Sequence, residues 1–213
     1  MTRAVLWDLD GTLVDSAELH WLSWRDTLAA EGVSITYERF LESFGQKNDR
    51  ILSAWLAGSD AGTIARIGEA KEAAYRRLAV THGLTPLPGA ADWLSRLRAA
   101  GWRQAIASSA PRENVVVMLG ALALQDYFDA ITSAEDVTAG KPDPQVFLSA
   151  ASRLDVTPSR CVVVEDAAAG IEAARRAAMR SVGVSRGTRL DADVYVTSLD
   201  KLPPETFDRL VEK

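Results

Sequence analysis

The sequence has no long apolar run, because no stretch approaches the roughly 20 residues that a helix needs to cross a bilayer. Two aspartates close to the start interrupt any core of a signal peptide. Basic residues form no run either, and 24 Lys and Arg against 29 Asp and Glu leave a net charge of −5. We expect a cytoplasmic protein that binds neither membrane nor nucleic acid, and we also expect a monomer.

Cysteine is nearly absent, since Cys161 is the single one. It cannot form an internal disulfide, and its place in the apolar run CVVV predicts a buried structural thiol rather than a reactive one. Repeats, low-complexity segments and long linkers are also missing. The 213 residues suffice for one α/β domain with a modest insertion.

What the sequence does contain is most informative at residues 4–13, AVLWDLDGTL. A short apolar run ends in Asp8 and Asp10, whose spacing on a strand points both carboxylates to one side, and Gly11 lets the backbone bend directly afterwards. This arrangement is typical of a nucleophile in phosphoryl transfer. A calcium loop would need further oxygen ligands, but Leu13 and Val14 follow instead.

Three later segments supply the partners that such chemistry needs. Ser108 and Ser109 end one apolar run, Lys141 stands in the Pro-flanked KPDP segment, and Glu165 and Asp166 end another apolar run. Each segment is a strand end or loop followed by a helix-like stretch. In open parallel sheets, ligand groups gather outside the carboxyl ends of the strands, so we expect all four segments to converge on one crevice.

The hydrophobic period predicts two domains. Helical spacing over 16–31, 37–44, 47–57 and 62–82 places four helices in a row, which no βα alternation contains. We therefore expect a helical cap domain over 16–85, inserted into a core domain formed by 1–15 and 86–213. Asp15 and Ser16 are expected to cap the first cap helix, and the alternative is a place in the hinge on which the cap closes. Trp21, Trp24 and Trp55 are expected in the core of the cap, and the alternative is that one of them lines the substrate cleft.

The core domain alternates strands and helices. Valine-rich strands flanked by alanine-rich helices indicate a parallel sheet covered on both faces. The strands are expected at 3–8, 103–108, 130–132, 161–165, 181–184 and 193–196, and the helices at 90–100, 112–119, 144–153, 168–178 and 204–211.

On these residues the chain resembles the haloacid dehalogenase-like superfamily and, within it, the β-phosphoglucomutase-like phosphatases with a helical cap. The motifs that carry the resemblance are DLDGT (8–12), ASS (107–109), KPDP (141–144) and EDAAAG (165–170). The resemblance covers nearly the whole chain. It implies an α/β fold with a doubly wound, Rossmann-like parallel sheet as core and an inserted α-helical cap.

Charge repulsion is the obstacle to phosphoryl transfer onto Asp8, which is already ionised at neutral pH and needs no base. A negative charge about 4 Å from a phosphate dianion costs on the order of 8 kcal/mol at an effective dielectric of about 20. We expect Mg²⁺, with Asp8 and Asp166 as ligands, and Lys141 as the further cation. The resemblance adds the backbone carbonyl of Asp10 as a ligand and Glu165 as an assisting acid.

Two roles remain in the predicted reaction, namely phosphate binding by Ser108 and Ser109 and proton transfer by Asp10. Ser108 would hydrogen-bond a phosphate oxygen, and phosphate binding near Ser109 would use a backbone N–H, since Ala110 has no polar side chain. Asp10 would protonate the leaving oxygen and then take a proton from the attacking water, which requires its pKa to rise by about 3 units. In the resembled superfamily an acid at this second position points to phosphate esters.

The cap residues should select the substrate. By resemblance, His20 lies near the acid/base aspartate and Lys71 contacts substrate phosphate, but a half-exposed helical histidine and a solvated lysine are the alternatives. Asn48 stands where the resembled mutase has an arginine that grips the second phosphate, and Lys47 or Arg50 would have to replace it.

Three functions are compatible with these residues. The first is a Mg²⁺-dependent phosphatase that acts on a small phosphorylated metabolite, a sugar phosphate for example. The second is a phosphosugar mutase of the β-phosphoglucomutase type, and Asn48 is evidence against it. The third is a non-catalytic binding or regulatory protein, and the intact set of acids with Lys141 is evidence against it.

Overall fold

The computed structural model describes residues 2–43 and 46–212, so the end of the helix expected over 37–44 lies outside the described residues. The chain divides into two compact units. One consists of Met1–Asp15 with Thr85–Lys213, and the other is Ser16–Leu84. The division thus falls one residue before the predicted limit of the cap at residue 85. None of the helices in the described ranges has both the length and the apolar character of a membrane span.

The first unit is built on a parallel sheet whose described strands follow the order β3-β2-β1-β4-β5-β6. All neighbouring pairs are parallel. The order reverses direction at β1, so the sheet is doubly wound, and the predicted fold class is confirmed. The strands are β1 (Ala4–Trp7), β2 (Arg103–Ala107), β3 (Ala130–Thr132), β4 (Cys161–Glu165), β5 (Arg180–Val184) and β6 (Val194–Val196).

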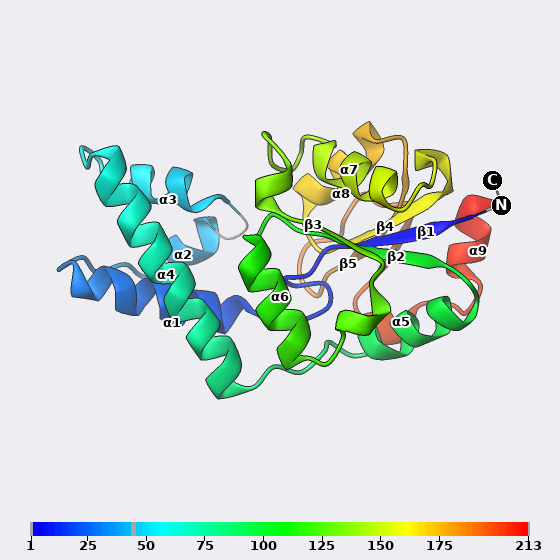
Figure 1. The fold of residues 1–213 in the computed structure, drawn as a ribbon, viewed down its shortest axis with the longest axis horizontal. Coiled ribbons are helices and arrows are strands. Elements are labelled where there is room, and N and C mark those ends of the chain that lie inside the picture. Colours follow the sequence, from blue (N-terminus) through cyan, green and yellow to red (C-terminus); the bar gives the residue numbers. More distant parts are fainter. Residues whose placement is uncertain (1, 44–45, 213) are drawn as a thin grey trace. The chain divides into compact units, whose positions relative to one another are not determined.

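Helices cover both faces of this sheet (Figure 1). On one face, α7 (Gln145–Arg153) and α8 (Ala168–Arg176) pack against β1, β2 and β4, with Phe147 and Ala150 among the fully buried side chains. The other face carries α5 (Ala90–Ala99) and α9 (Thr206–Val211). Both faces are therefore apolar, as the valine-rich strands predict.

An aromatic cluster fills the α5 and α9 face. The ring of Phe207 lies 5.0 Å from that of Trp93 and 6.2 Å from that of Trp7, measured between centroids. The indole N–H of Trp7 donates to the buried side chain of Gln104 at 3.0 Å, which satisfies a polar group that burial would otherwise penalise. The other described elements of this unit are α6 (Arg112–Ala121) and the short 3₁₀ helices η1 (Gln125–Tyr127), η2 (Ala134–Asp136), η3 (Pro158–Arg160) and η4 (Leu199–Lys201).

Cys161 begins β4 and is fully buried. Burial raises the pKa of its thiol to about 12, so the thiol is protonated at neutral pH. Since the thiolate is the reactive form, the prediction of an inert structural cysteine is confirmed.

The regular elements described in the second unit are all helices. It contains α1 (Ala17–Ala30), α2 (Tyr37–Ser43), α3 (Asn48–Trp55) and α4 (Ala61–His82). Its core centres on Trp24, Leu28 and Phe40, and the partly buried Trp21 and Trp55 pack against it. The predicted role of the three tryptophans as core residues of this unit is confirmed.

Of the two residues predicted to cap the first helix, Ser16 does not do so through its side chain, and the role of Asp15 stays a prediction. Ser16 does stand at the N-cap position of α1, but its side chain makes no capping hydrogen bond. Its backbone angles of φ −107° and ψ 0° are helical, whereas a capping side chain normally extends from a residue in the β region. Asp60 has that geometry at the start of α4, and its carboxylate accepts hydrogen bonds from the backbone N–H groups of Gly62 and Thr63.

Candidate active site

The pairing register of β1, β2 and β4 places the motif residues at the end of each strand along the same edge of the sheet. Trp7 is level with Ile106 on β2 and with Val164 on β4, so each of these strands ends at the same height. Asp8 follows β1 directly, and its backbone N–H donates to the carbonyl of Val164 at 3.0 Å. Glu165 is the last residue of β4. The acids therefore meet at the carboxyl ends of the strands, as expected for this sheet.

Lys141 joins these acids from the loop before α7. Its Nζ lies 2.5 Å from Asp8 Oδ1 and 3.5 Å from Glu165 Oε1, and its side chain is only 8% exposed. Asp143 holds the loop in place, since its carboxylate accepts from the backbone N–H of Gln145 at the start of α7.

The carboxylates of Asp8, Glu165 and Asp166 form a group in which one oxygen of each lies within 4.8 Å of the others. Within the described part of the chain, Glu165 Oε2 is buried and has no hydrogen-bond partner. A buried, unpartnered carboxylate oxygen is costly unless a ligand completes it. An all-oxygen, anionic donor set fits a hard divalent cation such as Mg²⁺.

Electrostatics support the same interpretation. Burial, and next the charge of Asp8, raise the pKa of Glu165 well above its ordinary value, and the same two causes raise that of Asp166 to about 7. Burial also raises the pKa of Asp8, although the Lys141 ammonium opposes the rise. For Lys141 burial acts downward, but the carboxylates of Asp8 and Glu165 outweigh it and raise its pKa. When all three acids are ionised, they carry more negative charge than one ammonium balances.

Asp10 lies in the turn after β1 and is outside the group of three carboxylates. Its charge nevertheless contributes to the raised pKa of both Asp8 and Asp166. The turn is closed by hydrogen bonds from Gly11 N to Val14 O at 2.8 Å and from Leu13 N to Leu9 O at 3.0 Å. The predicted acid/base role of Asp10 and the use of its carbonyl as a ligand stay predictions.

Sequence reasoning expected Gly11 only to bend the backbone, and it gave no role to Thr12. Gly11 has a φ of +83°, and a Cβ at this position would lie 2.1 Å from Asp166 Oδ2, so the turn leaves room only for glycine. The hydroxyl of Thr12 lies 3.4 Å from Asp166 Oδ1 and donates to it. Both residues belong to the DLDGT motif, and this motif is the sequence feature from which their roles could have been predicted.

The serine pair lies at the end of β2. Ser108 is buried, and its backbone N–H donates to the carbonyl of Thr132 at 3.0 Å. Its hydroxyl oxygen accepts from the backbone N–H of Ala110 at 3.0 Å, so the N–H of Ala110 already has a partner within the protein. The hydroxyl hydrogen of Ser108 can still donate. Ser109 is half-buried.

Two of the predicted cap residues meet inside the helical unit, on α1 and α4. Lys71 is 2% exposed, so the alternative of a solvated lysine is wrong. Its Nζ lies 2.9 Å from His20 Nδ1 and 2.9 Å from Glu72 Oε1. Asn48 Nδ2 donates to the same oxygen of Glu72 at 2.6 Å. We call Asn48, Glu72, Lys71 and His20 the cap cluster.

The Lys71 contact constrains the tautomer of His20. With Lys71 as an ammonium, which has three donors and no acceptor, Nδ1 of His20 is the acceptor, and a neutral ring then carries its proton on Nε2. Tyr75 stacks on the ring, with 4.1 Å between centroids. Glu72 and Tyr75 were missed by sequence reasoning, because nothing in the local pattern of α4 indicates which polar side chains turn inward. Lys47 and Arg50 are exposed, and the structure does not bring them into the cluster.

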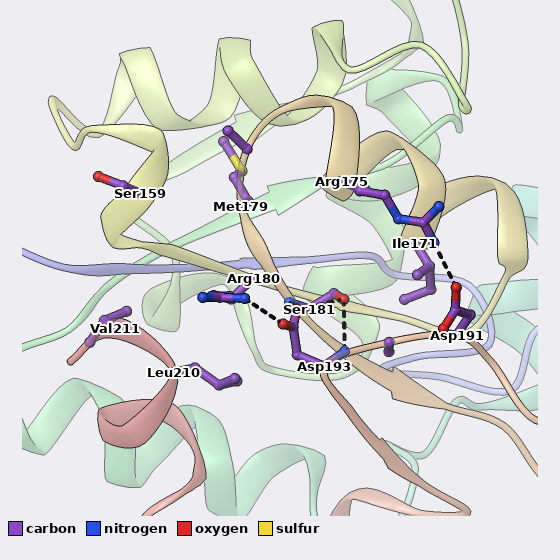
Figure 2. A pocket seen from close by; sticks show the side chains of 12 residues that line it. Ser159, Ile171, Arg175, Met179, Arg180, Ser181, Asp191, Asp193, Leu210 and Val211 are labelled. Carbon is purple, nitrogen blue, oxygen red and sulfur yellow. Dashed lines mark hydrogen bonds and ion pairs between the residues drawn. The ribbon is translucent and has the colours of Figure 1, made fainter. Parts of the chain in front are cut away.

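A cavity of about 580 Å³ lies elsewhere in the first unit, where β5 begins (Figure 2). Arg180 on its wall pairs with Asp193 at 2.8 Å, and Arg175 pairs with Asp191 at 2.9 Å. Since Arg180 is the first residue of β5, the cavity is at the amino ends of the strands, opposite to the carboxylates. The candidate active site is therefore the carboxylate group with Lys141, and not this cavity.

Comparison with known proteins bears on this assignment. Residues 2–178 match the family model described as haloacid dehalogenase-like hydrolase. The chain is 36% identical to a β-phosphoglucomutase of Bacillus subtilis (strain 168) over 213 residues, which covers 95% of this chain and 92% of the relative. It is 31% identical to hexitol phosphatase B of Escherichia coli (strain K12), with 93% of each covered.

A solved structure shows the same fold. The crystal structure of β-phosphoglucomutase (pgmB) from Clostridium difficile matches with a TM-score of 0.89 at 28% identity, and the match covers 100% of this chain and 98% of the other. The similarity thus extends over both units and does not stop at the motifs.

Proposed function

The chain belongs to the haloacid dehalogenase-like hydrolases, in their β-phosphoglucomutase-like group, and from this premise we propose that it is a Mg²⁺-dependent phosphatase of small phosphorylated metabolites, most suitably sugar phosphates. The observation that carries the proposal is the position of Asp8, which lies 2.5 Å from Lys141 and next to two further carboxylates. Such a site provides both a nucleophile and the charge that a phosphate needs.

In the proposed reaction Asp8 attacks phosphorus. A bond forms between a carboxylate oxygen of Asp8 and phosphorus, the ester bond to the leaving oxygen breaks, and Asp10 gives that oxygen its proton. Water then attacks the phosphoaspartate, Asp10 takes a proton from the water, and phosphate leaves with Asp8 restored. Lys141 and the Ser108 hydroxyl hold phosphate oxygens through hydrogen bonds, with Ser109 beside them.

Mg²⁺ fits this site because its preferred ligands are oxygens. Asp8, Glu165 and Asp166 would hold it, together with the backbone carbonyl of Asp10. When bound, the ion supplies positive charge that offsets repulsion between the phosphate and the nucleophile. The buried, unpartnered Oε2 of Glu165 supports the presence of a cation in the working enzyme.

We propose that cap residues recognise the part of the substrate that is not transferred. The candidates are His20, Lys47, Asn48, Arg50 and Lys71. Within the cap cluster, however, the Lys71 charge is matched by Glu72, and the Asn48 amide is neutral and donates to Glu72. This charge balance favours a substrate with one phosphate over a bisphosphate, and hence hydrolysis over mutase activity.

A β-phosphoglucomutase-type mutase is the second candidate, and the 36% identity to the Bacillus subtilis enzyme favours it. It would need to hold a bisphosphate intermediate at both ends. A third alternative, a non-catalytic protein, would have no use for a buried lysine held against the nucleophile and two further acids.

The test is phosphate release from a panel of sugar and other small phosphomonoesters with Mg²⁺. Wild type is compared with Asp8→Asn, which should lose all turnover while keeping its fold in thermal unfolding. Asp92→Asn, an exposed change on α5, is the matched control. The panel includes β-glucose 1-phosphate with identification of the product. Glucose 6-phosphate without net phosphate release would make the protein a mutase, and full activity in Asp8→Asn would exclude the mechanism.

A further inference from the structure

Gly170 lies in the first turn of α8 and is buried. A Cβ built on its backbone would lie 2.0 Å from Oε1 of Glu165, 2.1 Å from Cδ and 2.2 Å from Cγ. Real Cβ atoms do not approach other atoms so closely. The carboxyl end of the Glu165 side chain therefore occupies the volume that any other residue at position 170 would fill.

Glu165 has little freedom to go elsewhere. Its side chain is 2% exposed, and Oε1 lies 3.5 Å from the Lys141 ammonium. One of its oxygens lies within 4.8 Å of oxygens of Asp8 and Asp166. Because protein interiors are close-packed, a methyl group at position 170 would displace the carboxylate from this arrangement rather than fit beside it.

Helix geometry does not require a glycine at position 170. Its φ is not in the left-handed region, so the backbone at this position would accept any residue. Alanine also favours a helix more than glycine does. At Gly120, a glycine in α6, a Cβ would meet nothing within 4 Å. Gly120 and Gly170 thus differ in what surrounds them, and of these two only Gly170 adjoins a carboxylate of the candidate active site.

We propose that Gly170 is a positioning residue that sets the place of the Glu165 carboxylate and, through it, the affinity of the site for Mg²⁺. The proposal rests on the function proposed above. Gly11 makes room for Asp166 in a similar way, but its φ of +83° would strain any substitution, so the effect of crowding could not be separated there. Gly170 offers the clean test.

The experiment compares Gly170→Ala with Gly120→Ala. The dissociation constant of Mg²⁺ is measured by calorimetric titration of the metal-free protein, with far-UV circular dichroism and thermal unfolding in EDTA as checks on the fold. We expect Gly170→Ala to bind Mg²⁺ at least about 10-fold more weakly, in line with the effect of changes around metal ligands. Gly120→Ala should bind it as wild type does.

A double variant separates positioning from general damage. In the Glu165→Ala background the crowded atoms are gone, so adding Gly170→Ala should change Mg²⁺ affinity by less than about 2-fold. The same loss in both backgrounds would overturn the proposal, as would unchanged affinity in Gly170→Ala alone. Failure of the wild-type protein to bind Mg²⁺ would instead overturn the proposed function, and the positioning role with it.

Discussion

At the scale of single residues, the carboxylates of Asp8 and Asp10 follow the same strand but have different surroundings. Asp8 is buried and lies 2.5 Å from Lys141, whereas Asp10 is in the following turn, outside the group of three acids. A nucleophile must be ionised, and an ammonium partner favours the ionised form. A general acid must keep its proton, which is easier away from that ammonium. This difference in surroundings supports the proposed division of roles between Asp8 and Asp10.

Asp10→Asn should lower turnover by about 10²- to 10⁴-fold, because it removes both proton transfers of the proposed reaction. Loss of the proton acceptor in the second step should also let phosphoenzyme accumulate. Steady-state phosphate release and mass spectrometry of acid-quenched protein measure the two effects. Normal turnover in this variant would show that another group is the acid and base.

At the scale of elements, η2, α6 and α7 are joined by one carboxylate. Asp136 in η2 accepts hydrogen bonds from the backbone and hydroxyl of Ser133, and it pairs with Arg112 on α6 at 2.5 Å and Arg153 on α7 at 2.6 Å. Burial acts to raise the pKa of Asp136, but the bonds from Ser133 and Arg153 and the Arg112 charge outweigh it and hold the pKa below its ordinary value.

Asp136→Asn should destabilise the protein by about 1–3 kcal/mol at pH 7, the range for losing charge-assisted hydrogen bonds. A carboxyl whose folded pKa is depressed contributes stability above its unfolded pKa and loses it as pH falls through the folded value. The difference between variant and wild type should therefore shrink as pH falls below 3.8. Urea unfolding at pH 7 and pH 3 measures it, and a difference that is constant with pH would contradict the assignment.

At the scale of the whole molecule, burial of the crowded acids disfavours their ionised forms in the folded protein. The pKa of Asp166 rises from 3.8 to about 7, chiefly through burial and then through the charge of Asp8. A shift of this size corresponds to on the order of 4 kcal/mol. Any ligand that binds only the folded state stabilises all of it by mass action. Mg²⁺ binding should therefore raise the melting temperature of the protein.

Asp166→Asn should have opposite effects without and with the metal. In EDTA at pH 7.5 the variant should melt at least about 2–4 °C above wild type, because a disfavoured buried charge is gone. With Mg²⁺ the variant should lose most of the metal-induced rise. Thermal unfolding of both proteins under both conditions decides this, and a variant that is less stable in EDTA would refute the account of the acids.

The local pattern of the sequence determined the elements of this protein. Hydrophobic period depends only on neighbouring residues, so the strand ahead of Asp8, the four helices after Ser16 and the alternation after Gly89 could all be predicted with limits close to those observed. The parallel sheet could be predicted as well, because only a sheet covered on both faces uses such apolar strands. The cytoplasmic location and the monomeric state stay predictions.

Tertiary structure alone decided which polar side chains are buried and what surrounds them. Lys71 is inside its helical unit because α1 and α4 pack there, and no pattern along α4 distinguishes it from a surface lysine. In the same way, nothing in the local sequence distinguishes Gly170 from other helix residues, and only the structure shows that the Glu165 carboxylate occupies the space where its Cβ would lie. Burial and close approach arise between residues distant along the chain or turned toward each other by packing, so local period carries no record of them. The sequence by itself thus determined the elements and the motif acids, and packing decided the environment in which those acids act.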